Sequence, residues 1–172
     1  MTPLTMQPFV FSRGLATGDP VVDAQHRTLF AIGNQVLFAG DVREDPLLFR
    51  RGGEFLARYV RHHFAAEESA MERCGYPDLV EHREHHRVLT VRVEWIRDQA
   101  SSVGQTGGLR EVLYTLLNEW LRYHVQVLDR HFVQFLASRH VEDSGELSGV
   151  AAGIDAVTAS EEDVADRIRQ FW

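Results

Sequence analysis

Two histidine-containing motifs restrict this chain to helices that face one another. His63 and Glu67 are four residues apart, and His82 and His86 are also four residues apart, after a Gly-Tyr-Pro break at 75–77. Residues four apart lie on the same face of an α-helix, one turn above the other. We therefore expect two consecutive helices, each directing a pair of metal-binding side chains into a shared interior.

Apolar residues recur at spacings of three and four along most of residues 20–135, which predicts four amphipathic helices. A histidine lies in every predicted apolar stripe. The stripes are Val22, His26, Leu29, Gly33 and Val36; Leu56, Val60, Phe64 and Met71, flanked by Tyr59, His63 and Glu67; Leu79, His82, His86, Leu89, Val93 and Ile96; and Leu113, Leu117, Trp120, His124, Val127 and His131. The interior of the predicted fold is therefore rich in imidazole.

The predicted helix boundaries follow from capping residues and breaks. Asp19-Pro20 and Asp45-Pro46 are typical helix starts, with Asp23 as a rival cap for the first helix. The first helix is expected to end near Gly40, and Cys74-Gly-Tyr-Pro ends the second. Residues 101–108 are a loop by composition, and the fourth helix is expected to end at Phe135.

Four helices with short connections predict an all-α fold, an up-down-up-down antiparallel four-helix bundle. We expect residues 1–140 to form the bundle, with residues 1–18 as an extended N-terminal arm. Residues 141–172 are expected to form an acidic tail, with a linker and then a short amphipathic helix that presents Val164, Ile168 and Phe171. The tail carries 2 Arg against 8 acidic residues, so it holds −6 of the net charge of −7.

Composition excludes several classes of protein. The chain of 172 residues is long enough for one buried core, and no apolar run approaches the roughly 20 residues of a membrane span. Its charge distribution predicts no nucleic-acid footprint. The single cysteine, Cys74, cannot form an intrachain disulfide and is expected to be a small apolar residue near a helix end. We therefore expect a cytoplasmic protein that binds neither membrane nor nucleic acid.

A metal explains the interior histidines better than packing does. One buried histidine is more often a satisfied core residue than a ligand. Here five histidines and Glu67 would have to be explained together, and a lone buried carboxylate costs several kcal/mol. Five imidazoles and a carboxylate exceed the needs of one tetrahedral zinc, so two ions fit better. The ligand types suit iron, copper, zinc or nickel.

Asp129 is a further candidate that helical geometry does not pair with His124. Five residues on an α-helix turn through about 140° and rise about 7.5 Å. Asp129 could therefore reach the same site only from the shoulder of the helix.

The residues together resemble the hemerythrins, most closely the bacterial ones. The matching motifs are Asp23-Ala-Gln-His26, His63-Phe-Ala-Ala-Glu67-Glu68, Gly75-Tyr76-Pro77, His82-xxx-His86 and Trp120-Leu121-xx-His124-xxxx-Asp129. The resemblance covers about residues 9–138, and all seven ligand positions of the family carry the expected residue type. A match at seven positions within this context is highly specific.

The resemblance implies a non-haem di-iron centre that binds O2. His82, His86 and His124 would bind one iron and His26 and His63 the other. Glu67 and Asp129 would bridge the two irons beside an oxo or hydroxo bridge. The count gives six ligands at the first iron and five at the second, where the family binds O2. Phe64 and Leu121 flank ligands and are expected to form the wall of the O2 pocket.

Three functions are compatible with such a centre. The leading hypothesis is reversible O2 binding for storage, delivery or transport, without enzymatic activity. The second is sensing of O2, redox state or NO through a protein partner bound by residues 155–172. The third is oxidoreductase chemistry, such as oxidase, peroxidase, NO-handling or iron–sulfur repair activity.

The remaining histidines are expected to lie outside the centre. His62 and His85 each neighbour a ligand in sequence and should point away from the site, to the surface. His131 follows His124 by two turns and could be a group behind the ligands or at the bundle end, and His140 begins the tail. The chain departs from the bacterial members at Phe11, fifteen residues before the first expected ligand, His26. Many bacterial members have a Trp at this position. Phe11 is expected to cover the bundle end.

Overall fold

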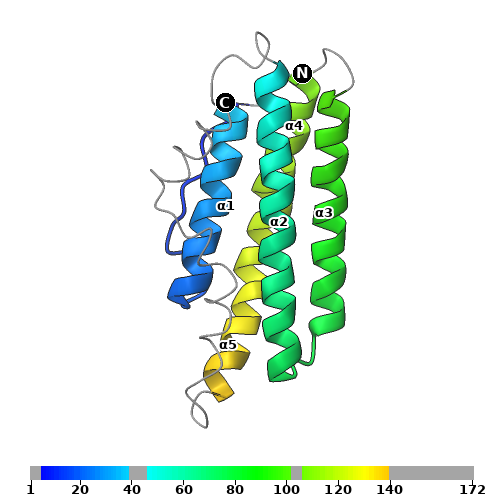
Figure 1. The fold of residues 1–172 in the computed structure, drawn as a ribbon. Helices are drawn as coiled ribbons and strands as arrows, with labels where there is room; N and C mark the ends of the chain where they lie inside the picture. Colours follow the sequence, from blue (N-terminus) through cyan, green and yellow to red (C-terminus); the bar gives the residue numbers. More distant parts are fainter. Residues whose placement is uncertain (1–4, 39–45, 102–105, 140–172) are drawn as a thin grey trace.

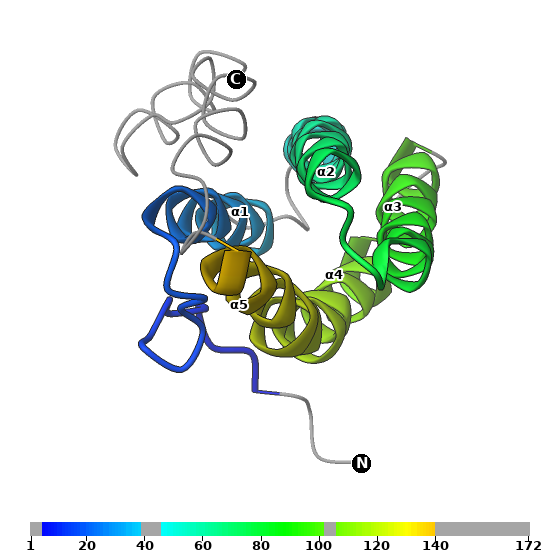
Figure 2. The same ribbon diagram turned by 90° about the horizontal axis from the view of Figure 1, so that it is seen from below.

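A computed structural model describes residues 5–38, 46–101 and 106–139, and it confirms the four-helix bundle (Figure 1). The elements are α1 (Pro20–Phe38), α2 (Pro46–Cys74), α3 (Leu79–Ser101), α4 (Thr106–Thr115), η1 (Leu116–Leu121), η2 (His124–Asp129) and α5 (Arg130–Arg139). The last four form one continuous rod, which closes the bundle against α1 and α3 (Figure 2).

The predicted start of α1 and end of α2 are made by the residues that the sequence indicates. The Asp19 carboxylate accepts hydrogen bonds from the backbone N–H groups of Val21 and Val22, at 2.8 and 2.9 Å, and so caps α1. Beyond Cys74, Gly75 has a φ of 64°. The N–H groups of Gly75 and Tyr76 then bond back to the last turn of α2, which is the Schellman arrangement.

Two apolar clusters fill the bundle and leave a polar layer between them. The larger cluster includes Leu29, Phe64, Leu89 and Val125. The smaller one lies toward the α2–α3 turn and contains Met71, Cys74, Tyr76, Phe132 and Leu136, with Ala70. On α2, α3 and the fourth rod, predicted metal-binding residues lie between residues of the two clusters, so apolar packing lies on both sides of the polar layer there. Cys74 is buried, as its apolar role requires.

The fourth rod departs from the prediction because its middle is not α-helical. Residues 116–121 and 124–129 are π-helical, with bonds that span five residues instead of four. Each wider turn shifts the positions that face the core to later residues in the chain. Val127 is therefore only half-buried and His131 is exposed, whereas the stripe predicted both inside. Asp129 and Phe132 occupy the interior instead.

The predicted loop at 101–108 is shorter than expected. Ser101 is the last residue of α3, and α4 already begins at Thr106. Gly107 and Gly108 therefore lie in the first turn of a helix, where glycine is tolerated better than in a helix interior.

The N-terminal arm packs on the bundle. Its Thr17 donates from its backbone N–H and its hydroxyl to the Asp23 carboxylate, at 2.7 and 2.8 Å. Asp23 therefore holds the arm, and the rival role as helix cap belongs to Asp19 alone. Phe11 is half-buried against Phe30, beside the core, with its ring centroid 6.4 Å away.

Some expectations fall outside the described residues. These are the end of the first helix near Gly40, the tail from residue 141 with its short helix, and His140. None of the helices within the described ranges is long and apolar enough to cross a membrane.

Candidate metal centre

All seven expected ligands converge in the polar layer of the bundle. Each has at most 2% of its surface exposed. The side chains come from α1 (His26), α2 (His63, Glu67), α3 (His82, His86) and η2 (His124, Asp129). No two adjacent helices could assemble this set, so the centre depends on the whole bundle.

Five of the residues form one group around a common point. His82, His86, His124, Glu67 and Asp129 each offer a donor atom, and these atoms lie within 4.8 Å of one another. The Nε2 atoms of His82 and His124 are each 3.1 Å from Asp129 Oδ1. The His86 Nε2 atom is 3.3 Å from Glu67 Oε2. Three imidazoles and two carboxylates therefore face one position.

A second group shares Glu67 with the first. His26, His63 and Glu67 also have donor atoms within 4.8 Å of one another. Asp129 connects the groups as well: its Oδ2 atom is 3.1 Å from His26 Nε2, while its Oδ1 atom faces His82 and His124. Both carboxylates thus lie between two sets of imidazoles, which is the arrangement that two neighbouring cations require.

The donor atoms fit metal ions better than they fit one another. Two donors bound at about 2.1 Å and at right angles lie about 3 Å apart, close to the separations observed. The Nε2 atoms of His26 and His82 and all four carboxylate oxygens of Glu67 and Asp129 are buried and have no hydrogen-bond partner among the described residues. Buried carboxylates without partners are costly, and a cation removes that cost.

The electrostatics leave the carboxylates charged. Burial raises the pKa of Asp129, but the facing His124, His26 and His82 outweigh burial and hold that pKa well below its usual value. Burial and Asp129 likewise raise the pKa of Glu67, yet His63 and His86 lower it further, so the net shift is downward. Both bridging candidates are therefore anionic, as cation binding demands.

Burial also keeps two of the imidazoles neutral. It lowers the pKa of His63 to about 4 and lowers the pKa of His124 below its ordinary value. A neutral imidazole offers a lone pair to a metal, whereas a protonated one does not.

Two side chains without a predicted role, Gln25 and Glu68, orient two of the expected ligand histidines. His63 Nδ1 lies 2.9 Å from Gln25 Oε1, and His86 Nδ1 lies 2.9 Å from Glu68 Oε1. These oxygens accept hydrogen bonds, so each Nδ1 carries the proton and each Nε2 is left to bind a cation. A signal was present in the sequence, since Gln25 precedes His26 and Glu68 follows Glu67 in the quoted motifs.

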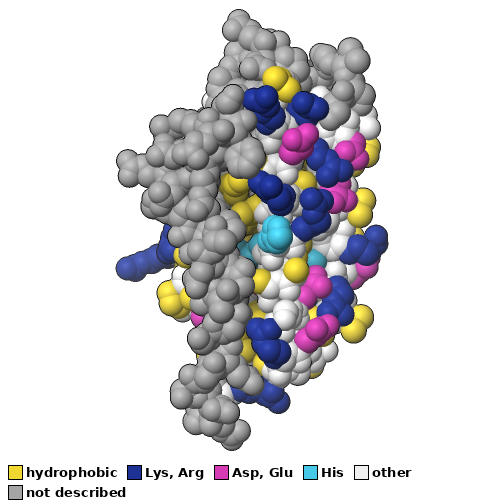
Figure 3. Space-filling view, viewed as in Figure 1, with side chains coloured by type: hydrophobic (Ala, Val, Ile, Leu, Met, Phe, Trp, Pro, Cys, Tyr) yellow, Lys and Arg dark blue, Asp and Glu magenta, His cyan; other side chains and the backbone are white. Residues whose placement is uncertain are grey.

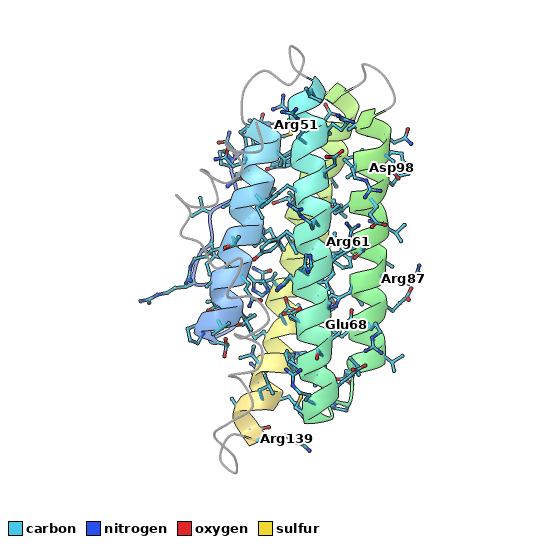
Figure 4. The ribbon with its side chains drawn as sticks, viewed as in Figure 1. Arg51, Arg61, Glu68, Arg87, Asp98 and Arg139 are labelled. Atoms are coloured by element: carbon cyan, nitrogen blue, oxygen red, sulfur yellow. The ribbon has the colours of Figure 1, made fainter. Side chains whose placement is uncertain are left out.

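Glu68 is itself held from the surface. The Arg83 guanidinium donates to Glu68 at 2.9 Å and also to Glu72. Glu68 lies on α2 among mixed arginine and acidic side chains that cover α2 and α3 (Figures 3 and 4). Another such pair on this face joins Arg61 to Glu94. The contact of His86 with Glu68 thus extends from the interior to a surface ion pair.

Phe64 contacts expected ligands of both groups. Its ring stacks on that of His86, with centroids 3.7 Å apart and planes 6° apart, and its centroid is 5.5 Å from that of His63. Leu121 is almost fully buried in the adjoining apolar cluster. Both side chains help to exclude water from the layer.

The other histidines divide differently from the prediction. His62 is exposed, as expected, and His131 is exposed, so it does not lie behind the expected ligands. His85 was expected at the surface, but it is half-buried and its ring centroid lies 6.2 Å from that of His124. It turns toward the fourth rod because Trp120 and Tyr123 provide an aromatic surface there.

Comparison with known proteins agrees with this geometry. The model of the hemerythrin HHE cation binding domain matches residues 17–136. The chain is 32% identical over 129 residues to a bacteriohemerythrin of Ralstonia nicotianae, covering 75% of this chain and 89% of that protein. A bacteriohemerythrin of Stenotrophomonas maltophilia is 30% identical over 132 residues, covering 74% and 80% of the two chains.

A more distant bacteriohemerythrin, from Clostridium acetobutylicum, is 23% identical over 131 residues and is covered over 98% of its length. The corresponding comparison with solved structures gives no match. The domain match and the relatives together span the bundle that carries the seven residues, and this chain belongs to the hemerythrin family.

Proposed function

We propose that this protein binds O2 reversibly at a non-haem di-iron centre. The observation that carries the proposal is the position of the two carboxylates. Glu67 belongs to both groups of donor atoms, and Asp129 directs one oxygen toward each group. One cation would leave part of this set unused, whereas two cations use all of it.

The residues assign different ligand counts to the two irons. His82, His86 and His124 would hold one iron, and His26 and His63 would hold the other, with Glu67 and Asp129 shared. The first iron thus has one more imidazole than the second. The second iron has a position left for an external ligand, and we propose that O2 binds there.

The balance of charge favours binding over bond cleavage. Two ferrous ions carry +4, and the two carboxylates offset only 2 of it. A set richer in carboxylates, as in the ferritin-like di-iron proteins, would better stabilise high-valent iron. A set dominated by five imidazoles gives less of that stabilisation, so the chemistry should stop at reversible uptake. The iron supplies the redox chemistry, and the chain supplies orientation and exclusion of water.

The surroundings of the centre support a carrier role. Phe64 and Leu121 are each less than 4% exposed, and the apolar clusters close the layer from both ends. An enclosure of this kind admits a small apolar molecule and slows the entry of water. Slower water entry in turn slows the irreversible oxidation of the iron. The names of the relatives, bacteriohemerythrins, agree with the proposal.

Metal analysis combined with absorption spectroscopy tests the proposal. The purified protein should hold two irons per chain. Admitting air to the anaerobic ferrous form should produce an oxo-to-iron charge-transfer band that disappears under vacuum and returns with air. One zinc per chain, or a single irreversible oxidation, would contradict it.

A pair of neighbouring histidines on α2 provides matched variants. His63→Ala removes an expected ligand and should abolish the reversible band, with iron content falling below two per chain. His62→Ala changes an exposed histidine one residue away and should leave both unchanged. If both variants keep the same iron content and the same reversible band, His63 is not a ligand of the centre.

A further inference from the structure

A pocket lined mainly by arginines lies on the surface of the bundle where α2 packs against α3. Its volume is about 480 Å³. The lining consists of Arg51, Glu54, Phe55, Arg58 and Arg61 from α2 and Arg97 from α3. Four arginines against one glutamate give this lining a charge of +3. None of these residues is an expected metal ligand, so the pocket is separate from the metal centre.

The pocket stays positive when the acidic partners of its arginines are counted. Arg61 pairs with Glu94, and Arg97 pairs with Asp98, both on α3. These two carboxylates reduce the local charge from +3 to +1. The surface therefore favours an occupant with several negative charges over a neutral or basic one.

The basic character belongs to the first half of α2 as a whole. Residues 46–61 carry four Arg and one Glu, whereas residues 62–74 carry one Arg and three Glu. Arginine side chains accordingly gather over the upper part of α2 in Figure 3, and Arg51 and Arg61 lie along it in Figure 4. An acidic segment that lies along α2 is therefore attracted to the first half of the helix and repelled from the second.

Phe55 adds an apolar surface to the pocket. Its side chain is half-buried, and it packs against the larger apolar cluster. The Arg58 guanidinium lies 5.9 Å from the centroid of its ring. An occupant that carries both carboxylates and apolar side chains matches this combination, whereas a small inorganic anion would leave the ring uncovered.

The C-terminal tail of the chain has both properties. Residues 161–166 contain four acidic residues and no arginine. Val164, Ile168 and Phe171 form the apolar stripe of the predicted tail helix. A helix of about a dozen residues is marginal by itself in water, and an uncovered apolar stripe is costly. Docking on a surface that offers arginines and an aromatic ring would remove both costs.

The pocket is within reach of the tail. The fourth rod ends at Arg139, whose guanidinium donates to the carbonyl of Cys74 at the end of α2. From Cys74, the lining residues Arg58 and Arg51 lie about 24 and 35 Å back along the helix axis, at a rise of ~1.5 Å per residue. Residues 140–159 can span up to about 66 Å. A tethered segment within reach has an effective concentration on the order of millimolar, which favours the chain's own tail over that of another copy.

We propose that residues 160–171 of the tail dock as a short helix on this arginine pocket of the same chain. The acidic residues 161–166 face the arginines, and the apolar stripe covers Phe55. A docked tail leaves neither the basic surface nor the apolar stripe available to another protein. The docking lies outside the metal centre and does not rest on the di-iron function.

Hydrogen exchange of the full-length protein tests the docking. At about 0.05 M salt, the amides of residues 160–171 should exchange at least about tenfold more slowly than those of a free peptide of the same sequence. Exchange should quicken as the salt is raised to about 1 M, because screening weakens contacts between surface charges. Exchange as fast as in the free peptide, or protection that salt does not change, would overturn the proposal.

Two charge reversals of equal size locate the docking site. Arg58 is exposed in the pocket lining, and Arg58→Glu should quicken exchange of residues 160–171 about fivefold, the loss expected for a surface ion pair. Arg87→Glu changes an exposed arginine of α3 outside the pocket and should leave the tail unchanged. Helical circular dichroism should be the same in both variants. Protection that survives Arg58→Glu, or equal losses in both variants, refutes this site.

Two other occupants would give different results. If a second copy supplies the tail, protection should rise with protein concentration together with a dimer. If the acidic stretch at residues 41–45 occupies the pocket, Arg58→Glu should quicken exchange there and leave residues 160–171 unchanged. Either result overturns docking of the tail on its own chain.

Discussion

His124 Nε2 and Asp129 Oδ1 lie 3.1 Å apart although five residues separate them in the chain. An α-helix would place these side chains about 140° apart around its axis. The π-helical segment His124–Asp129 reduces that separation, because its wider turn brings residues five apart closer to the same face. The local widening of the fourth rod therefore places the carboxylate between the two groups of histidines.

Asp129→Asn should break the proposed two-metal centre while preserving the bundle. The amide keeps the shape of the carboxylate but loses its charge and one of its two oxygens, so an NH2 group replaces the oxygen that faces either His26 or His82. We expect iron content to fall from two to at most one per chain, measured by elemental analysis, with little change in helical circular dichroism. Asp98→Asn, a surface change on α3, is the control. Two irons in Asp129→Asn would show that this carboxylate does not bridge.

Glu68→Gln should weaken metal retention without removing a ligand. The carboxylate accepts from His86 Nδ1 and makes the imidazole a better donor, an effect that typically amounts to about 10–100-fold in metal affinity. Chelator competition would measure the loss.

Glu72→Gln is the matched control for Glu68→Gln. Glu72 also pairs with Arg83, but it is more exposed than Glu68. If both variants lose metal equally, the surface ion pair, and not the bond to His86, supports the centre.

Gly33→Ala should destabilise the bundle because α1 and the η1 part of the fourth rod approach closely there. A Cβ atom at this position would lie 2.6 Å from a methyl group of Leu117, which is itself almost fully buried. Overpacking of this kind costs about 1–3 kcal/mol. Urea unfolding would measure the change in the free energy of unfolding.

Two further variants isolate the clash at Gly33. Leu117→Val removes the methyl group that the new Cβ atom would meet. The double variant, Gly33→Ala with Leu117→Val, should therefore lose less stability than the two single changes added together. Gly108→Ala meets no atom within 4 Å and should be neutral or stabilising by up to about 1 kcal/mol. Additive losses at Gly33 and Leu117 would argue against direct contact.

Asp23→Ala should release the N-terminal arm. The carboxylate is buried and accepts two hydrogen bonds from Thr17. Its loss leaves buried donors unpaired, which costs about 1–3 kcal/mol. Hydrogen exchange should quicken at Leu15–Gly18 before any global unfolding. The arm would remain partly held, because Arg130 donates to the carbonyls of Gly14 and Ala16. Unchanged exchange would show that Arg130 alone retains it.

Local spacing along the chain predicts the parts of this protein that follow the α-helical repeat. Spacings of three and four placed His26, His63, His82 and His86 inside the bundle, and Asp19 and Gly75 marked helix ends. These features depend on neighbours within one or two turns, so local spacing is sufficient to predict them.

The features that join different helices depend on how the bundle packs. The π-helical turns brought Asp129 inward and left His131 outside, because a change in helical repeat alters the register of every later residue. The partners Gln25 and Glu68, and the turn of His85 toward Trp120, depend on contacts across the bundle. Such contacts have no fixed spacing in the chain, so no periodic pattern reveals them.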